Sequence, residues 1–184
     1  RSLRTVFETH QFDGVFHLAA QSHPPTSFKD PIGTMETNVM GSANLIQVIQ
    51  DHQEACKLMF CSTSEVYGNV GQDGRKIHWE DHIVPSNPYG ASKAATDVYL
   101  QERMNNGFIK GFITRAFSHT GPRRGKNFSI NELVNMFGED YPKEYIPARK
   151  GEYPFTLADY TKANQELGWT PTLDIKDYIK TKVK

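Results

Sequence analysis

Residues 57–65 read Lys57-Leu58-Met59-Phe60-Cys61-Ser62-Thr63-Ser64-Glu65, an apolar run that ends in hydroxyl groups and a carboxylate. The apolar part is short and contains neither proline nor glycine. Such a run predicts a strand over 57–62 that is buried on both faces, as strands of parallel sheets are. The polar residues then fall where the chain leaves the sheet.

Two other apolar runs, 15–20 and 108–117, also predict buried strands. Residues 34–50, which lie before the central strand, are apolar at helical spacing. Residues 88–105, which follow it, form a second predicted helix with Pro88 in its first turn. The alternation of strands and helices predicts an α/β fold with a parallel sheet and right-handed crossovers. In such sheets, ligands bind at the carboxyl ends of the strands.

The rest of the chain is less regular. Ser86 or Asn87 is the expected cap of helix 88–105, because both side chains accept hydrogen bonds from the first turn. We expect loops over 21–31 and 68–87, which are rich in polar residues, proline or glycine. The remaining expected elements are helices at 3–10, 131–137, 160–168 and 175–184 and a short strand at 144–147.

Composition excludes several classes of protein. Hydrophobic residues make up 38% and charged residues 23%, which is typical of a globular domain. The 21 basic and 21 acidic residues cancel, which gives no support to nucleic-acid or membrane binding. No apolar stretch is long enough to cross a bilayer, and residues 1–4 begin no signal peptide. The two cysteines, Cys56 and Cys61, make a poor disulfide framework, so we expect a reduced, cytoplasmic setting. No spacing of His, Cys and Asp predicts a metal site.

Two groups of residues follow the predicted strands. Residues 18–22, Leu18-Ala19-Ala20-Gln21-Ser22, are mostly small and would let a flat or phosphorylated ligand approach the backbone. Such residues more often only pack against a helix. The hydroxyls and carboxylate of 62–65 are suited to bind a sugar hydroxyl and move a proton, although a simple turn uses the same residues.

Tyr89 and Lys93 form the third group. Residues four apart share a helix face, so the phenol and the ammonium are neighbours. Moving a tyrosine pKa from about 10 to about 7 needs roughly 4 kcal/mol, which a lysine and a cationic nicotinamide are able to supply. Tyr178 and Lys182 repeat this spacing in the tail, so the context of the first pair carries the signal.

Thr63, Tyr89 and Lys93 resemble the Ser/Thr–Tyr–Lys triad of the extended short-chain dehydrogenase/reductase family. Blocks similar to those of this family occur at 17–23, 62–68, 86–93, 115–122 and 167–171. The resemblance implies a Rossmann-like, doubly wound parallel sheet with a small C-terminal α/β substrate domain. It also implies NADP or NAD as cofactor and a nucleotide-diphosphate sugar as substrate.

Within the family, the pattern is most similar to that of the GDP-mannose 4,6-dehydratases. The similarity covers 121–128 and Arg149 followed by Glu152, although Lys150 stands where that group has proline. UDP-glucuronate decarboxylases share a block like 63–68, so this block does not identify the sugar.

The resemblance assigns roles to single residues. Tyr89 takes the proton of the sugar 4-hydroxyl while hydride leaves C4, Thr63 holds that hydroxyl, and Lys93 lowers the tyrosine pKa and binds the nicotinamide ribose. Glu65 removes the C5 proton and assists loss of the 6-hydroxyl, and hydride returns to C6. The implied cofactor contacts are Leu18, Ala19, Ala20, Gln21, Ser22, Tyr89, Lys93, His119 and Arg124. The implied substrate contacts are Ser64, Arg123, Asn127, Arg149 and Glu152, with the two arginines 123 and 149 suited to phosphate.

Two of these assignments have alternatives in which the residues play no part in binding or catalysis. The pair Arg123–Arg124 is also consistent with a solvated basic turn, and Glu65 with a surface carboxylate at a helix start. The same scaffold also serves 4-epimerisation, C5 decarboxylation or 4-keto reduction, among which epimerases and reductases need no base such as Glu65. A non-catalytic NAD(P)-binding protein is the alternative from another class, against which the intact triad argues.

Two departures from the family pattern predict an incomplete chain. The glycine-rich first turn that cradles the pyrophosphate is absent, since Gly14 is the first glycine and precedes the wrong strand. The step from Ile130 to Asn131 is too abrupt for the family. We therefore expect a partial cofactor domain over 1–130 and part of the substrate domain over 131–184. The family's dimer interface predicts a homodimer or homotetramer through helices 34–50 and 88–105, with apolar surface at Val98 and 100–104.

Overall fold

The computed structural model describes residues 2–118, 147, 151, 156–173 and 177. The chain divides into two compact units, Arg1–Phe117 with Lys150–Ala158, and Ser118–Arg149 with Asp159–Lys184. The predicted domain boundary at residue 130 lies outside the described residues. The predicted helix 131–137 also lies outside them, as do, apart from single positions, strand 144–147 and helix 175–184.

The first unit contains a three-stranded parallel sheet in the order β1-β2-β3. Its strands are β1 (Gly14–His17), β2 (Lys57–Cys61) and β3 (Lys110–Thr114). In register, Val15 lies beside Leu58, which lies beside Gly111. The predicted parallel, Rossmann-like sheet is confirmed, although the outer strands are shorter than the apolar runs 15–20 and 108–117.

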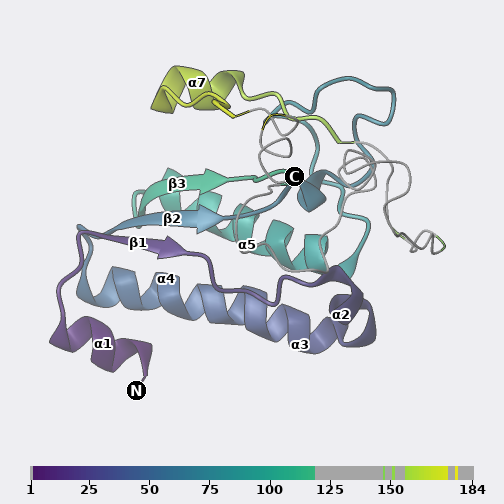
Figure 1. The fold of residues 1–184 in the computed structure, drawn as a ribbon. Coiled ribbons are helices and arrows are strands. Elements are labelled where there is room, and N and C mark those ends of the chain that lie inside the picture. The colour runs from purple at the N-terminus through teal and green to yellow at the C-terminus, as the bar shows by residue number, and fades with distance from the viewer. Residues whose placement is uncertain (1, 119–146, 148–150, 152–155, 174–176, 178–184) are drawn as a thin grey trace. The chain divides into compact units, whose positions relative to one another are not determined.

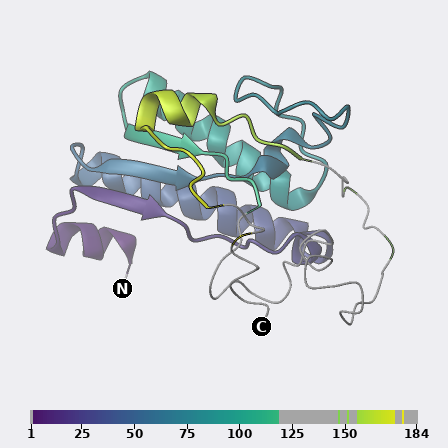
Figure 2. The same ribbon diagram turned by 45° about the horizontal axis from the view of Figure 1, so that its top comes forward.

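Two long helices connect the strands. A continuous helical segment consists of α3 (Pro31–Met35), the π-helix η1 (Glu36–Met40) and α4 (Gly41–His52). The second helix is α5 (Pro88–Asn105). Because the strands follow one another in space as in sequence, right-handed crossovers put both helices on the same face of the sheet. Figures 1 and 2 show α4 and α5 along that face.

The core lies between this face and the helices. Alternate residues of β2, Leu58 and Phe60, point into it and are almost fully buried. Burying such a side chain stabilises the fold by about 1.5–3 kcal/mol. The remaining buried apolar residues of this cluster are Phe7 of helix α1 (Leu3–Thr9), Leu45, Ile46, Ile49, Cys56, Leu100 and Ile109.

This packing corrects one expectation about association. Leu100 is 0% exposed and belongs to the core of its own chain, so it offers no surface to a partner. Val98 is 54% exposed, as expected.

A second expectation is also wrong, because the segment 21–31 is not all loop. It contains α2 (Pro24–Lys29), which has proline at its first position. Ser27 is fully buried, donates to Pro24 O (2.7 Å) and accepts from Tyr89 N (3.1 Å). The helix is therefore fixed by its contact with α5. Residues 68–87 form no helix or strand, as predicted, apart from a single bridge between Ile77 and Ala158.

The second unit contains α7 (Thr161–Leu167), close to the predicted 160–168. Asp159 Oδ1 accepts from Thr161 N (2.9 Å), and Gly168 ends the helix with φ +65°. Tyr160 packs edge-on against Trp169. Over the described part of the chain, no helix combines the length and the apolar character needed to cross a bilayer.

Candidate active site

Thr63 lies where the chain leaves β2. Backbone bonds to β3 continue past the strand end, from Ser62 N to Thr114 O (2.7 Å) and from Ser64 N to Ala116 O (2.9 Å). The extended Thr63 between them begins the 3₁₀-helix η2 (Ser64–Tyr67), and its Oγ1 accepts from Glu65 N (3.3 Å). The hydroxyl predicted to bind substrate is therefore held by the sheet.

The start of α5 brings Tyr89 to the same place. Asn87 caps the helix, because its Oδ1 accepts from Gly90 N (2.7 Å), and Pro88 occupies the first turn. Both features agree with the sequence prediction. Tyr89 and Lys93 then lie on successive turns of one helix face.

The Thr63 side chain is close enough to the Tyr89 phenol to act on its pKa. Burial raises the pKa of the Tyr89 phenol above its ordinary value, the polar side chain of Thr63 lowers it, and the neighbouring Cys61 and Glu65 raise it. The net direction is upward, so the phenol is protonated near neutral pH. Lowering of the Tyr89 pKa by Lys93 together with a bound nicotinamide stays a prediction.

Lys93 is a buried cation. Its side chain is 4% exposed, and burial lowers its pKa to about 8 against the opposing effects of Cys61 and Asp97. Its Nζ lies 4.2 Å from the centroid of the Phe60 ring, a distance at which a cation is attracted to an aromatic face. Among the residues that the structure describes, no acceptor forms a hydrogen bond with this Nζ.

Glu65 is oriented by the residue that caps α5. Asn87 Nδ2 donates to Glu65 Oε2 (2.7 Å), so one amide both begins the helix and holds the carboxylate. Gly90 allows the two segments to approach, since a Cβ there would lie 2.7 Å from Glu65 O. The cap is predicted by the sequence, whereas this second bond was not predicted. The signal that was available is an amide at the cap, which has two N–H donors to spare.

The segment after β1 is partly available to a ligand. Leu18, Ala19 and Ser22 are exposed, as a binding backbone requires, and Ala20 is half-buried. Gln21 instead uses its groups within the fold, because its Oε1 accepts from His23 N (2.7 Å) and its Nε2 donates to Thr34 Oγ1 (3.0 Å). These bonds hold the Gln21 side chain within the fold, and its contact with the cofactor stays a prediction.

The remaining candidate residues are placed as follows. Ser64, predicted to touch substrate, is half-buried in η2 beside Thr63. His119, Arg123, Arg124, Asn127, Arg149 and Glu152 lie outside the described residues. Over the ranges that the structure describes, no group of three or more His, Cys, Asp or Glu side chains is arranged to hold a metal ion.

An ion pair that was not predicted from the sequence joins α5 to the end of β3 next to the candidate site. Arg115, just after β3, forms two bonds with the fully buried Asp97 of α5 (2.9 and 3.0 Å). It also donates to Tyr67 Oη (2.9 Å) and Trp79 O (2.8 Å). Burial would lower the pKa of Arg115, but its bonds with Asp97 and Tyr67 raise it on balance. This arginine ties α5, η2 and the loop after η2 together.

The curated proteins that this chain resembles have names of enzymes that act on nucleotide sugars. GDP-6-deoxy-D-mannose reductase of Pseudomonas aeruginosa is 35% identical over 119 residues, which is 64% of this chain and 39% of that protein. dTDP-glucose 4,6-dehydratase of Xanthomonas campestris pv. campestris is 32% identical over 190 residues, 96% of this chain and 48% of that protein. The chain spans between 33% and 48% of the length of the first curated relatives that it matches.

The chain is also similar to solved structures of proteins in complex with NADPH or NAD. RMD from Pseudomonas aeruginosa complexed with NADPH has a TM-score of 0.61 and 30% identity, covering 68% of this chain and 42% of that one. UDP-glucose 4-epimerase of Thermus thermophilus, in complex with NAD, has a TM-score of 0.63 and 30% identity, covering 73% and 42%.

A family model for GDP-mannose 4,6 dehydratase matches residues 1–140. This range includes Thr63, Glu65, Tyr89 and Lys93, and the relatives named above include a dehydratase, an epimerase and a reductase. The chain therefore belongs to the GDP-mannose 4,6 dehydratase family, one of the extended short-chain dehydrogenases/reductases.

Proposed function

We propose that this chain carries the catalytic residues of a nucleotide-sugar 4,6-dehydratase, similar to GDP-mannose 4,6-dehydratase. The observation that carries the proposal is the Glu65 carboxylate, which Asn87 holds next to the Thr63–Tyr89 pair. Dehydration needs a base at C5 of the sugar in addition to the triad that oxidises C4. A 4-epimerase or a 4-keto reductase needs only the triad.

The cofactor that we propose is NADP or NAD, which agrees with the relatives solved with NADPH and with NAD. The residues present fit it, because a buried ammonium on Lys93 suits ribose hydroxyls and the exposed Leu18 and Ala19 offer backbone to a flat ring. A cofactor held by these residues would supply the acceptor for hydride from sugar C4 and the donor of hydride to C6.

The chain's own residues move the protons. Tyr89 takes the proton of the 4-hydroxyl, which Thr63 holds in place. Burial raises the pKa of Tyr89, so positive charge beside it is needed. We propose that Lys93 on the next turn and the bound nicotinamide supply it together. Once C4 is a ketone, Glu65 takes the C5 proton and gives it to the departing 6-hydroxyl, which leaves as water. Addition of hydride at C6 is completed by a proton at C5, which balances the proton that Tyr89 took from the 4-hydroxyl.

The test is product analysis with the full-length protein. It is incubated with NADP or NAD and with GDP-mannose, dTDP-glucose or UDP-glucose in turn, and the products are read by mass spectrometry and NMR. We expect a 4-keto-6-deoxy sugar that has lost one water. With Glu65→Gln, oxidation at C4 should persist while loss of water falls, whereas a product of unchanged mass from the wild-type protein would contradict dehydration.

Other reactions on the same triad are outcomes of this test. A 4-epimer keeps the mass. With UDP-glucuronate added to the set of substrates, a decarboxylase releases CO₂, and with a 4-keto sugar and NADPH or NADH, a reductase consumes reduced cofactor. The epimerase and the reductase among the relatives make these the second candidates. A non-catalytic protein would bind NADP or NAD and give no product with any sugar.

We also propose a homodimer or homotetramer that uses the outer surface of α5. Val98 is exposed on this helix, and Met104 is half-buried. Val98→Glu is expected to lower the mass measured by light scattering, and an unchanged mass would place the interface elsewhere.

A further inference from the structure

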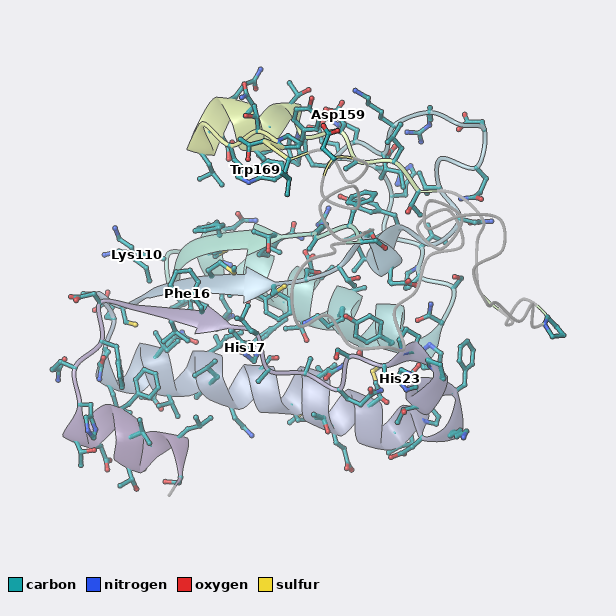
Figure 3. The ribbon with its side chains drawn as sticks, in the orientation of Figure 1. Phe16, His17, His23, Lys110, Asp159 and Trp169 are labelled. Carbon is teal, nitrogen blue, oxygen red and sulfur yellow. The ribbon has the colours of Figure 1, made fainter. Side chains whose placement is uncertain are left out.

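His17 is the last residue of β1 and points toward α4 (Figure 3). Its Nε2 lies 2.8 Å from Ser42 Oγ, and Ser42 Oγ lies 2.5 Å from Asn38 O. The imidazole is therefore the first member of a short hydrogen-bonded chain that ends on a helix carbonyl.

These two hydrogen bonds determine which ring nitrogen of His17 carries the proton. A carbonyl oxygen only accepts, so the single hydroxyl proton of Ser42 must be donated to Asn38 O. Ser42 Oγ then has only lone pairs to offer to His17. Nε2 must be the donor, which makes His17 the Nε2–H tautomer when it is neutral and leaves Nδ1 without a proton.

The Asn38 carbonyl, which accepts the last of these hydrogen bonds, is firmly held. It lies in the π-helix η1, where Gly41 N bonds five residues back to Glu36 O. Thr96 Oγ1 of α5 also donates to Asn38 O (3.1 Å), and Asn38 Nδ2 donates to Ser92 Oγ (2.8 Å). The acceptor for Ser42 is thus fixed to both helices that cover the sheet.

The Phe60 ring connects His17 with Lys93. The His17 ring lies 5.6 Å from the Phe60 ring, tilted by 42°, and the same Phe60 ring lies 4.2 Å from Lys93 Nζ. Burial lowers the pKa of His17, and the charge of Lys93 lowers it further. The other charged or titratable groups acting on Lys93 are Cys61 of β2 and Asp97 of α5.

We propose that His17 is a positioning residue, a neutral Nε2–H imidazole that Ser42 fixes against Phe60 so that the Phe60 ring holds the Lys93 ammonium in the site. A proton added to Nδ1 would put a second positive charge beside Lys93 and push the ammonium away. The catalytic consequence rests on the proposed function, while the tautomer and the coupling to Lys93 do not.

The tautomer is tested by NMR of the full-length protein labelled with ¹⁵N-histidine, with His17→Gln identifying the signal. Between about pH 6 and 8 we expect a protonated Nε2 and a bare Nδ1, and a mixture of tautomers in Ser42→Ala. Lys93→Met removes the neighbouring charge and should raise the pKa of His17. A protonated Nδ1, or a pKa of His17 that ignores Lys93→Met, would overturn the proposal.

The effect on turnover is tested separately. His17→Gln is expected to lower kcat about tenfold or more with little change in KM, because the ammonium is misplaced. It should also move the acid limb of the kcat profile to lower pH, a change that loss of stability alone does not produce. His10→Gln, at an exposed histidine, is the matched control and should leave both unchanged. An unaltered acid limb in His17→Gln contradicts the positioning role, whereas absence of turnover in the wild-type protein contradicts only the proposed function.

Discussion

Asn87 Nδ2 donates a 2.7 Å hydrogen bond to Glu65 Oε2, while Oδ1 of the same side chain accepts one from Gly90 N. The two roles are separable, because serine caps a helix as well as asparagine but has no N–H to give to a carboxylate. Asn87→Ser is therefore expected to change the free energy of unfolding by less than about 1 kcal/mol. Loss of water from the sugar should slow about 10- to 100-fold, because Glu65 is no longer held in line.

Single-turnover experiments with Asn87→Ser separate oxidation at C4 from loss of water. Oxidation at C4, followed by absorbance of the reduced cofactor, should remain close to the wild-type rate, while the water-loss product appears slowly. Asn87→Ala loses the cap as well and is expected to be less stable by about a further 1 kcal/mol. Equal slowing of both steps in Asn87→Ser would mean that the amide acts on the whole site.

Tyr89→Phe removes the phenol whose pKa Thr63 influences. We expect kcat to fall by roughly 10²–10⁴, the usual contribution of a positioned acid or base. The ring still fills its site, so the free energy of unfolding in urea should change by no more than about 1 kcal/mol. Tyr99→Phe, at a half-buried tyrosine on the same helix, is the control and should keep its activity.

The pH dependence of this phenol has a definite sign. Burial raises the pKa of Tyr89, so in the ligand-free protein it keeps its proton at a pH where exposed tyrosines are already half ionised. A difference titration between wild type and Tyr89→Phe at the phenolate absorbance should place it above the ordinary value of about 10. Ionisation below that value without ligand would show that burial is not the dominant effect.

The sequence predicts well those elements whose ends are determined locally. Helix α5 begins and ends where predicted, because Asn87 caps it and Pro88 suits its first turn. Helix α2 was missed because its polar sequence carries no apolar periodicity, and its stability depends on Ser27 reaching Tyr89 N, 62 residues away. A contact of that kind leaves no local signal.

The same distinction between local signals and long-range contacts applies to the residues of the candidate site. The spacing of Tyr89 and Lys93 and the hydroxyls after β2 were visible in the sequence, because each lies within one element. The bonds of Glu65 with Asn87 and of His17 with Ser42 join residues 22 and 25 positions apart, in different elements. They depend on the register of β1 and β2 and on the approach of α5, which only the folded chain defines.

Lys93→Met should stabilise the protein while it removes activity. The folded-state pKa of about 8 lies below the ordinary 10.5, so between these values the unfolded chain binds more protons and the free energy of unfolding rises with pH. Below about pH 8 the full penalty remains, on the order of 3 kcal/mol. The substitution removes this penalty, so unfolding in urea at pH 7 should require more denaturant.

The comparison is made between about pH 8 and 10, where the free energy of unfolding of the wild-type protein should rise relative to that of Lys93→Met. Burial raises the pKa of the Cys56 thiol, which lowers the free energy of unfolding of both proteins equally in this range. Above about pH 10 the raised pKa of Tyr89 acts with the opposite sign, since the unfolded phenol ionises first. Lys57→Met, at an exposed lysine, should keep the wild-type slope. A wild-type slope in Lys93→Met would mean that another group is responsible.

The pair formed by Asp97 and Arg115 is expected to show strong coupling. Arg115→Met leaves a carboxylate that is 0% exposed without its cation, and loss of one partner of a buried pair typically costs about 3–5 kcal/mol. Asp97→Leu alone leaves the guanidinium with Tyr67 and Trp79 O as acceptors, so its cost should be smaller. The double variant Asp97→Leu/Arg115→Met has no unpaired charge and should regain most of the stability lost in Arg115→Met. Urea unfolding of all four proteins measures the coupling free energy, and simple addition of the two single effects would show that the pair does not act as a unit.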